Sequence, residues 1–193
     1  DDIMEDLRPI NRYGYSKQLF DLHAKRTGII DRVVGLKFFN VFGPNEYHKE
    51  DMMSVVCKAH KQILENGELK LFKSYQDGYE DGGQKRDFVY VKDCVDVMWW
   101  LLKHEEVNGV FNVGTGQART WNDLATCVFT SLVKPVNISY FDMPENVKPH
   151  YQYFTEADMG KLKAAGYNRP FRTLEEAVND YVVNYLNDKV FLS

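Results

Sequence analysis

Two residues with complementary chemistry lie four positions apart near the start of the sequence. Tyr13 and Lys17 belong to the run RYGYSK, and on a helix such a pair shares one face, with Cβ atoms about 5–6 Å apart. A lysine ammonium beside a phenol stabilises the phenolate. A tyrosine in this setting can exchange a proton with a substrate hydroxyl during hydride transfer. The spacing alone also fits a surface tyrosine and lysine without a chemical role.

Two further features are candidates for phosphate binding. Arg86 lies in KRDFVYV, and a guanidinium can bind phosphate oxygens in a planar, two-pronged way, although a lone arginine also fits a surface salt bridge. Gly114-Thr115-Gly116 follows a predicted strand and precedes a predicted helix. It has no third glycine, so it is only half of a dinucleotide-binding fingerprint and by itself predicts a strand-to-helix turn.

The elements that must position these residues alternate between helix and strand. Hydrophobic spacing and stop signals predict helices over 13–26, 51–66, 95–103, 120–132, 155–165 and 173–187, and strands over 33–41, 69–72, 87–91, 110–113 and 138–141. Capping boxes are predicted at Thr120 and Thr173, and a simple cap at Thr155. The alternation indicates an α/β fold with a largely parallel sheet. Asn40 and Val41 end a predicted strand, where open parallel sheets bind ligands.

Composition excludes several classes of protein. The 193 residues carry a formal net charge of −4, with 44% hydrophobic and 27% charged residues, which is typical of a globular protein and not of a nucleic-acid binder. No apolar run approaches the roughly 20 residues of a membrane span. The three cysteines are widely spaced and predict buried thiols in a reducing compartment, hence a cytoplasmic protein. The histidines show no metal-ligand spacing, and we expect no metal site.

Four blocks of sequence together resemble a known family. The blocks RYGYSK, LKFFNVFGPNEYHK, KRDFVYVKDCVDV and GVFNVGTGQ occur in the order and spacing of the extended short-chain dehydrogenase/reductase family of nucleotide-sugar enzymes. Further segments, among them HYQYFTEADM and KAAGYNRPF, are similar to the members of that family that epimerise an ADP-heptose. The resemblance covers nearly all of the 193 residues.

The resemblance implies a fold and a domain organisation. It implies the C-terminal part of a Rossmann-like doubly wound parallel sheet plus a smaller α/β substrate-binding domain. Residues 1–43 would end the nucleotide-binding domain, and 44–193 would mainly form the substrate domain, with 87–116 returning to the Rossmann-like sheet. The family's N-terminal half, with its glycine-rich turn, has no counterpart in this sequence. We therefore expect the chain to depend on that half as a partner and to form a homo-oligomer, because alone it would expose sheet edges and an apolar face.

The resemblance also implies a reaction. An enzyme of this kind holds NADP and an ADP-heptose substrate, oxidises C6 to a ketone, and reduces it again on the opposite face. Tyr13 would be the acid/base on one face, and Lys49 in GPNEYHK the acid/base on the other, where it would also contact the cofactor. Lys17 would bind the nicotinamide ribose, and Val41 would contact the cofactor.

The same resemblance implies a set of substrate contacts. These are Asn40, Asp51, Lys58, Phe72, Lys73, Ser74, Tyr75, Arg86 and Tyr151, with Arg86 on the ADP part. Lys73 departs from the Phe-Glu-Gly-Ser that family members often carry, and Asp51 and Lys58 stand where some relatives have Ser and His. Two alternatives stay open. The first is a different extended short-chain enzyme, such as a sugar 4-epimerase or 4,6-dehydratase. The second is a non-catalytic binding or assembly module.

Overall fold

The chain folds as a mixed α/β structure. The computed structural model describes residues 5–9, 11–188 and 190–192. The helices are α1 (Arg12–Arg26), α2 (Val55–Asn66), α3 (Val91–Leu102), α4 (Trp121–Ser131), α5 (Gly160–Ala164) and α6 (Leu174–Tyr181). The strands are β1 (Val34–Phe38), β2 (Asn40–Phe42), β3 (Leu69–Phe72), β4 (Lys85–Tyr90), β5 (Gly109–Val113), β6 (Ala118–Thr120) and β7 (Ile138–Phe141). Short 3-10 turns span Ile29–Asp31, Tyr47–Met52 and Lys148–His150, and a π-helical turn, Val182–Leu186, continues α6.

Three small sheets are built mainly from parallel pairs. β1 pairs with β5, β2 with β4, and β3 with β7, all in parallel, while β6 runs antiparallel to β4. Helices connect the parallel strands, as they must when a chain returns to the same end of a sheet. The predicted α/β class with mostly parallel pairing is confirmed.

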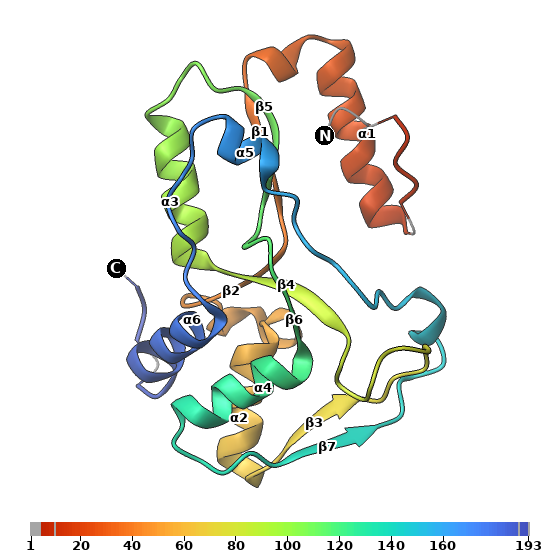
Figure 1. Ribbon diagram of the computed structural model, residues 1–193, viewed down its shortest axis with the longest axis vertical. Coiled ribbons are helices and arrows are strands. Elements are labelled where there is room, and N and C mark those ends of the chain that lie inside the picture. Colours follow the sequence, from red (N-terminus) through yellow and green to blue (C-terminus); the bar gives the residue numbers. More distant parts are fainter. Residues whose placement is uncertain (1–4, 10, 189, 193) are drawn as a thin grey trace.

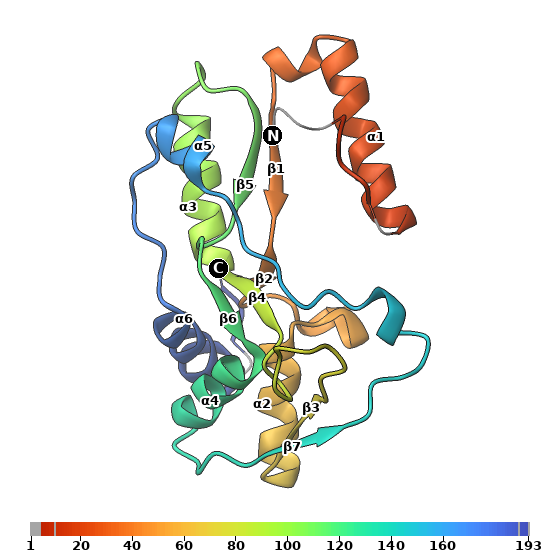
Figure 2. The ribbon, with the colours of Figure 1, turned by 45° about the vertical axis from the view of Figure 1, so that its right-hand side comes forward.

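The molecule has two hydrophobic cores that meet at β4. Successive side chains of a strand point to opposite faces, and accordingly Phe88 and Tyr90 lie in one core and Val89 lies in the other. The first core packs α2, α4 and α6 around β3, and the second packs α3 against β5 and α5. Figures 1 and 2 show the two groups of elements at opposite ends of the molecule, with β4 running between them.

Helix α1 lies beside β1, at the end of the molecule that holds the second core (Figure 2). Lys37 of β1 forms an ion pair with Asp21 on the inner face of α1. A hollow of about 430 Å³ remains between α1 and the β1–β5 pair, and Lys17 is among its lining residues. The helix carrying the predicted Tyr13–Lys17 pair is therefore tied to the sheet but leaves space in front of it.

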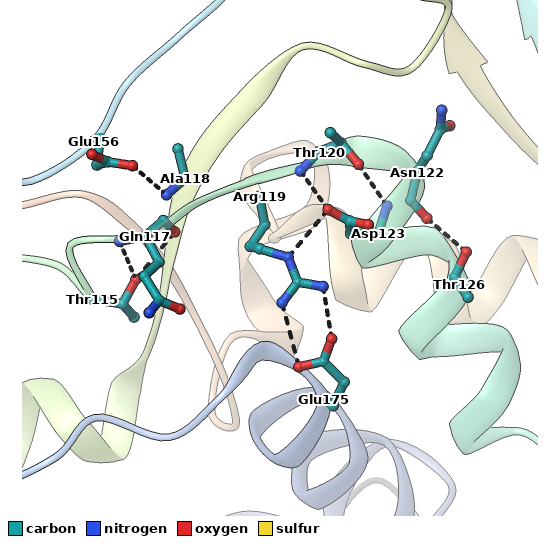
Figure 3. Close-up of polar contacts among 10 residues, drawn as sticks. All are labelled: Thr115, Gln117, Ala118, Arg119, Thr120, Asn122, Asp123, Thr126, Glu156 and Glu175. Carbon is teal, nitrogen blue, oxygen red and sulfur yellow. Dashed lines mark hydrogen bonds and ion pairs between the residues drawn. The ribbon is translucent and has the colours of Figure 1, made fainter.

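The predicted helix caps are partly confirmed. Thr120 and Thr173 both form capping boxes, with Asp123 and Glu176 as the third residues of their helices. Figure 3 shows the first of these at the start of α4, where Arg119 also bridges Asp123 to Glu175 of α6.

Three predicted helix starts are wrong. The helix predicted from residue 51 begins at Val55, because Ser54 accepts a hydrogen bond from Cys57 N and caps it. Helix α3 begins four residues before the predicted start. Thr155 caps no helix, since its backbone N–H donates to Lys85 O at 3.2 Å and α5 is limited to Gly160–Ala164.

The strand predictions need two corrections. The strand predicted over 33–41 is divided at Phe39 into β1 and β2, which pair with different partners. Strand β6 was not predicted, because its three residues, which include the capping Thr120, show no strand pattern of their own. The three cysteines are buried free thiols, as predicted.

Candidate active site

The Tyr13–Lys17 pair lies on one face of α1, as the spacing predicts. Asn11 caps this helix by accepting a hydrogen bond from Gly14 N at 2.8 Å. The Lys17 Nζ lies 5.0 Å from the centre of the Tyr13 ring. Tyr13 is 72% exposed, and within the described residues no carboxylate forms an ion pair with Lys17. The phenol and the ammonium are therefore both free to meet a ligand.

Asn40 and Val41 lie on β2, which pairs in parallel with β4. Both residues are exposed. Beside them is a hollow of about 210 Å³, lined also by the starts of α2 and α4, including Ser54 and Trp121. These two residues begin β2 instead of ending the strand predicted over 33–41, so their predicted position at a strand end is wrong, and their contacts with a ligand stay a prediction.

Lys49 lies in the 3-10 turn that follows β2. Its side chain is exposed and makes no hydrogen bond or ion pair within the described residues. In the same turn, the main-chain oxygen of Asp51 accepts a hydrogen bond of 2.5 Å from Lys58 Nζ. Asp51 and Lys58 are thus brought together, and both remain exposed.

Arg86 is the most unusual of the predicted residues. It is only 7% exposed, and its guanidinium carbon lies 5.2 Å from the Tyr151 ring and 5.9 Å from the Trp121 ring. It donates to the main-chain oxygens of Lys85, at 2.8 Å, and Gln152. Within the described residues no carboxylate pairs with it, and burial lowers the pKa of Arg86. A buried guanidinium without a counter-ion is suited to binding an anion.

Aromatic side chains connect Arg86 to the loop after β3. Tyr151 accepts a hydrogen bond of 3.0 Å from Trp121 Nε1, and burial raises the pKa of its hydroxyl. The Phe72 ring meets the Tyr151 ring edge-on, with centroids 6.2 Å apart. Phe72, Arg86 and Tyr151 come from three separate parts of the sequence, and the structure brings them together.

The next three residues are anchored by acidic partners. Lys73 Nζ lies 3.2 Å from Asp142 Oδ1, and the Tyr75 hydroxyl donates to the same oxygen at 2.5 Å. These two donors hold the pKa of Asp142 below its ordinary value. The backbone N–H of Ser74 donates to Asp81 Oδ1 at 2.7 Å. Lys73, Ser74 and Tyr75 therefore have protein partners in this structure, and their role toward a substrate stays a prediction.

The Gly114-Thr115-Gly116 turn is filled by a side chain of the protein itself. Asp87 Oδ1 accepts from Thr115 N at 2.8 Å and from Thr115 Oγ1 at 2.7 Å. Asp87 Oδ2 accepts from Gly116 N at 2.9 Å and from Ala157 N at 3.0 Å. A Cβ at Gly114 would lie 2.6 Å from Asp87 Oδ2, so the glycine permits this close approach. A buried carboxylate therefore fills this turn, but the prediction of a strand-to-helix turn is wrong, because the turn connects β5 to β6.

Several residues of this site were not predicted. Trp121, Asp87 and Asp142 each act through contacts with residues more than 25 positions away. A tryptophan directly after the Thr120 cap was the one available signal, since an exposed helix start seldom needs so large an apolar side chain. Within the described residues, no group of three or more His, Cys, Asp or Glu is placed to hold a metal ion.

A family model extends the resemblance seen in the sequence. Residues 1–114 match the model described as "NAD dependent epimerase/dehydratase family". The chain belongs to this family. It is 60% identical over 186 residues to a protein of Nitratidesulfovibrio vulgaris and 47% identical over 190 residues to one of Fusobacterium nucleatum, both named ADP-L-glycero-D-manno-heptose-6-epimerase. These alignments cover 96% and 95% of this chain, but the chain spans only 58% and 57% of the relatives' lengths.

Solved structures of the epimerase/dehydratase family share the fold. The crystal structure of Helicobacter pylori ADP-L-glycero-D-manno-heptose-6-epimerase matches with a TM-score of 0.74 and 29% identity, covering 92% of this chain and 52% of that one. Thermus thermophilus UDP-glucose 4-epimerase, in complex with NAD, matches with a TM-score of 0.75 and 24% identity, covering 95% and 56%. The Rossmann-like α/β class is thereby confirmed. No helix among the described residues has both the length and the apolarity needed to cross a membrane.

Proposed function

We propose that the protein is an epimerase that converts ADP-D-glycero-D-manno-heptose to ADP-L-glycero-D-manno-heptose by inverting C6. The observation that carries this proposal is the 60% identity to a named ADP-heptose 6-epimerase, sustained over 96% of the chain. The UDP-glucose 4-epimerase structure matches at 24% identity, so it supports a shared fold and not that activity.

Tyr13 and Lys49 are the proposed acid/base pair. Oxidation of C6 requires a group that takes the hydroxyl proton, and reduction on the opposite face requires a second group that returns one. The exposed Tyr13 phenol, with Lys17 Nζ 5.0 Å from its ring centre, supports the first role. The exposed Lys49 ammonium, free of protein partners within the described residues, supports the second.

The proposed cofactor is NADP, bound at its nicotinamide end by Lys17, Val41 and Lys49. When bound, the nicotinamide supplies a hydride acceptor and donor. The exposure of Tyr13, Val41 and Lys49 fits this end of the cofactor. The Gly114-Thr115-Gly116 turn is not free to bind the cofactor's diphosphate, because Asp87 fills it.

Arg86 is proposed to bind the diphosphate of the substrate. Its burial between Tyr151 and Trp121 without a carboxylate supports this role. The remaining proposed substrate contacts are Asn40, Asp51, Lys58, Phe72, Lys73, Ser74, Tyr75 and Tyr151. Of these, Phe72 is joined to the Arg86 group through Tyr151.

The domain division, cellular location and assembly also belong to the proposal. We retain a nucleotide-binding part over 1–43 and 87–116 and a substrate part over the rest of 44–193. Residues 1–4, 10, 189 and 193 of these ranges lie outside the described residues. Three buried thiols support a reducing, cytoplasmic location. Exposed Tyr15, Leu19 and Phe20 on α1 support association with further polypeptide or with a second copy.

The test is epimerisation by the full-length protein. It is incubated with NADP and ADP-D-glycero-D-manno-heptose, and the L-epimer is quantified by proton NMR. Tyr13→Phe and Lys49→Met should each lower the turnover number by about 10²–10⁴-fold, the usual contribution of a positioned acid or base. Lys163→Met, at an exposed lysine of α5, is the matched control for Lys49→Met and should leave the rate unchanged. Absence of the L-epimer with wild-type protein, or full activity of both variants, would refute the proposal.

A further inference from the structure

A buried carboxylate lies at the base of the turn that carries Lys49. Glu46 is only 5% exposed. Its Oε2 accepts from Ser54 N at 2.6 Å, and its Oε1 accepts from Ser54 Oγ at 2.6 Å and from the Tyr181 hydroxyl at 2.8 Å. Within the described residues no lysine, arginine or histidine pairs with it. A charge without a counter-ion is tolerated in the interior only where several donors converge on it, as they do here.

The hydrogen bonds between Glu46 and Ser54 join the two ends of the segment 46–54, which contains Lys49. Glu46 stands at the start of the turn, and Ser54 stands at its end as the N-cap of α2. Within the segment 46–54, Lys49 N donates to Glu46 O at 3.0 Å, and Met53 N donates to Glu50 O at 3.2 Å. One side chain therefore fixes both ends of the segment, with the lysine near its middle.

One residue of the segment 46–54 has a backbone conformation that non-glycine residues rarely adopt. Glu50, the residue after Lys49, has φ 46° and ψ −117°, values that cost a non-glycine residue about 1–3 kcal/mol. Such a conformation persists where surrounding contacts impose it. Asn45 and Tyr47 add further contacts, since they hydrogen-bond to main-chain atoms of Leu192 and Val190.

We propose that Glu46 is the positioning residue for Lys49, setting where its ammonium stands relative to the reacting carbon. This inference rests on the proposed function, in which Lys49 is an acid/base. The Glu46 side chain is buried and its bonds point to Ser54 and Tyr181, so it acts on the reaction through the turn and not by touching substrate. Lys49 itself has no side-chain partner within the described residues, so the position of its ammonium depends on the turn that carries it.

The test is a double-mutant cycle on the full-length protein with NADP and ADP-D-glycero-D-manno-heptose. Glu46→Gln keeps the size of the side chain but has one acceptor oxygen, which can face Ser54 N only if its NH₂ faces the Ser54 and Tyr181 hydroxyls, so these two donors to Glu46 must turn to become acceptors. We expect single-turnover epimerisation to fall about 10–100-fold, because misplacement of a catalytic group by about 1 Å costs up to 10²-fold. The KM for the ADP-heptose should change less than the rate, because Arg86 lies on another element and Asp51 is the one proposed substrate contact that the turn carries. Glu65→Gln, an exposed glutamate of α2, is the matched control.

The decisive comparison is made in the Lys49→Met background. If Glu46 acts through Lys49, adding Glu46→Gln there causes no further loss, since coupled residues are not additive. An equal loss in both backgrounds, or no loss in either, overturns the proposal. Full activity of Lys49→Met overturns the proposed function at this residue and the inference with it, which distinguishes the two failures.

A second variant keeps the test valid if Glu46→Gln does not fold. Tyr181→Phe removes one of the three donors and leaves the Glu46–Ser54 bonds in place. It should lower the single-turnover rate about 3–10-fold, as expected for one hydrogen bond, and have no effect in the Lys49→Met background. The same loss in both backgrounds would overturn the proposal.

Discussion

Asp87→Asn tests whether the Gly114-Thr115-Gly116 turn is organised by an internal carboxylate. The wild-type carboxylate accepts four hydrogen bonds of 2.7–3.0 Å from three backbone N–H groups and one hydroxyl. Asparagine has the same shape but only one acceptor oxygen. In the best orientation its amide oxygen serves Gly116 and Ala157, and its NH₂ donates to the Thr115 hydroxyl. The N–H of Thr115 is then left facing another donor.

The magnitude follows from this inventory of bonds. One buried donor without a partner costs about 1–3 kcal/mol, and bonds to a neutral acceptor are weaker than bonds to a charged one by roughly 1 kcal/mol each. Relief of the buried charge offsets part of this loss. We therefore expect Asp87→Asn to lower the free energy of unfolding by about 2–4 kcal/mol.

Urea unfolding of the full-length protein, followed by tryptophan fluorescence, measures this change. Asp77→Asn, at an exposed loop position, is the control and should change the unfolding free energy by less than about 0.5 kcal/mol. A loss below about 1 kcal/mol for Asp87→Asn would refute the assigned bonds. A gain in NADP affinity on removing the negative charge would mean that the turn binds phosphate, and would refute our interpretation of it.

Two further predictions concern stability. Glu50 occupies the φ and ψ of the first central residue of a type II′ turn, a position that favours glycine. Glu50→Gly should therefore stabilise the protein by about 1 kcal/mol in urea unfolding, whereas Glu50→Ala should bring no gain, and a destabilised glycine variant would contradict the reasoning. Burial by itself would raise the pKa of Asp180, but hydrogen bonds from Lys92 and Tyr90 hold it below its ordinary value. A carboxyl with a depressed folded pKa stabilises the protein above its unfolded pKa of about 3.9, and this contribution is lost as pH falls through the folded pKa. The unfolding free energy of the wild type should therefore fall more steeply between about pH 5 and pH 3 than that of Asp180→Asn, and parallel pH curves would count against the lowered pKa.

Features that depend on a few neighbouring residues could be predicted from the sequence alone. The capping boxes at Thr120 and Thr173 are set by bonds across three residues, and both are present. The Tyr13–Lys17 pair shares a helix face because the helix repeat dictates it. The parallel α/β class followed from the alternation of elements. The roles of the predicted site residues remain proposals.

Some segments have a local sequence that fits two different local structures, and there the tertiary structure decided which one forms. Thr155 has the composition of a helix cap, but its backbone pairs with Lys85 next to β4 instead. The helix predicted from residue 51 begins only at Val55, because the preceding turn is closed by Glu46 from eight residues away. Local propensity is a fraction of a kilocalorie per residue, so a few long-range hydrogen bonds override it.

Tertiary packing also decided which residues of the site are in contact with one another. Arg86 and Tyr151 are 65 positions apart, yet the buried Arg86 guanidinium lies close to the half-buried rings of both Trp121 and Tyr151. Asp87 lies 28 positions before Thr115, and its carboxylate accepts hydrogen bonds from the N–H groups of the turn at 114–116. We therefore no longer count this turn among the candidates for phosphate binding. The sequence by itself determined which residue types were available and the approximate place of most helices and strands. Only the packing of distant segments determined which polar groups became buried, and a buried polar group must find a partner that a pattern of neighbouring residues does not specify.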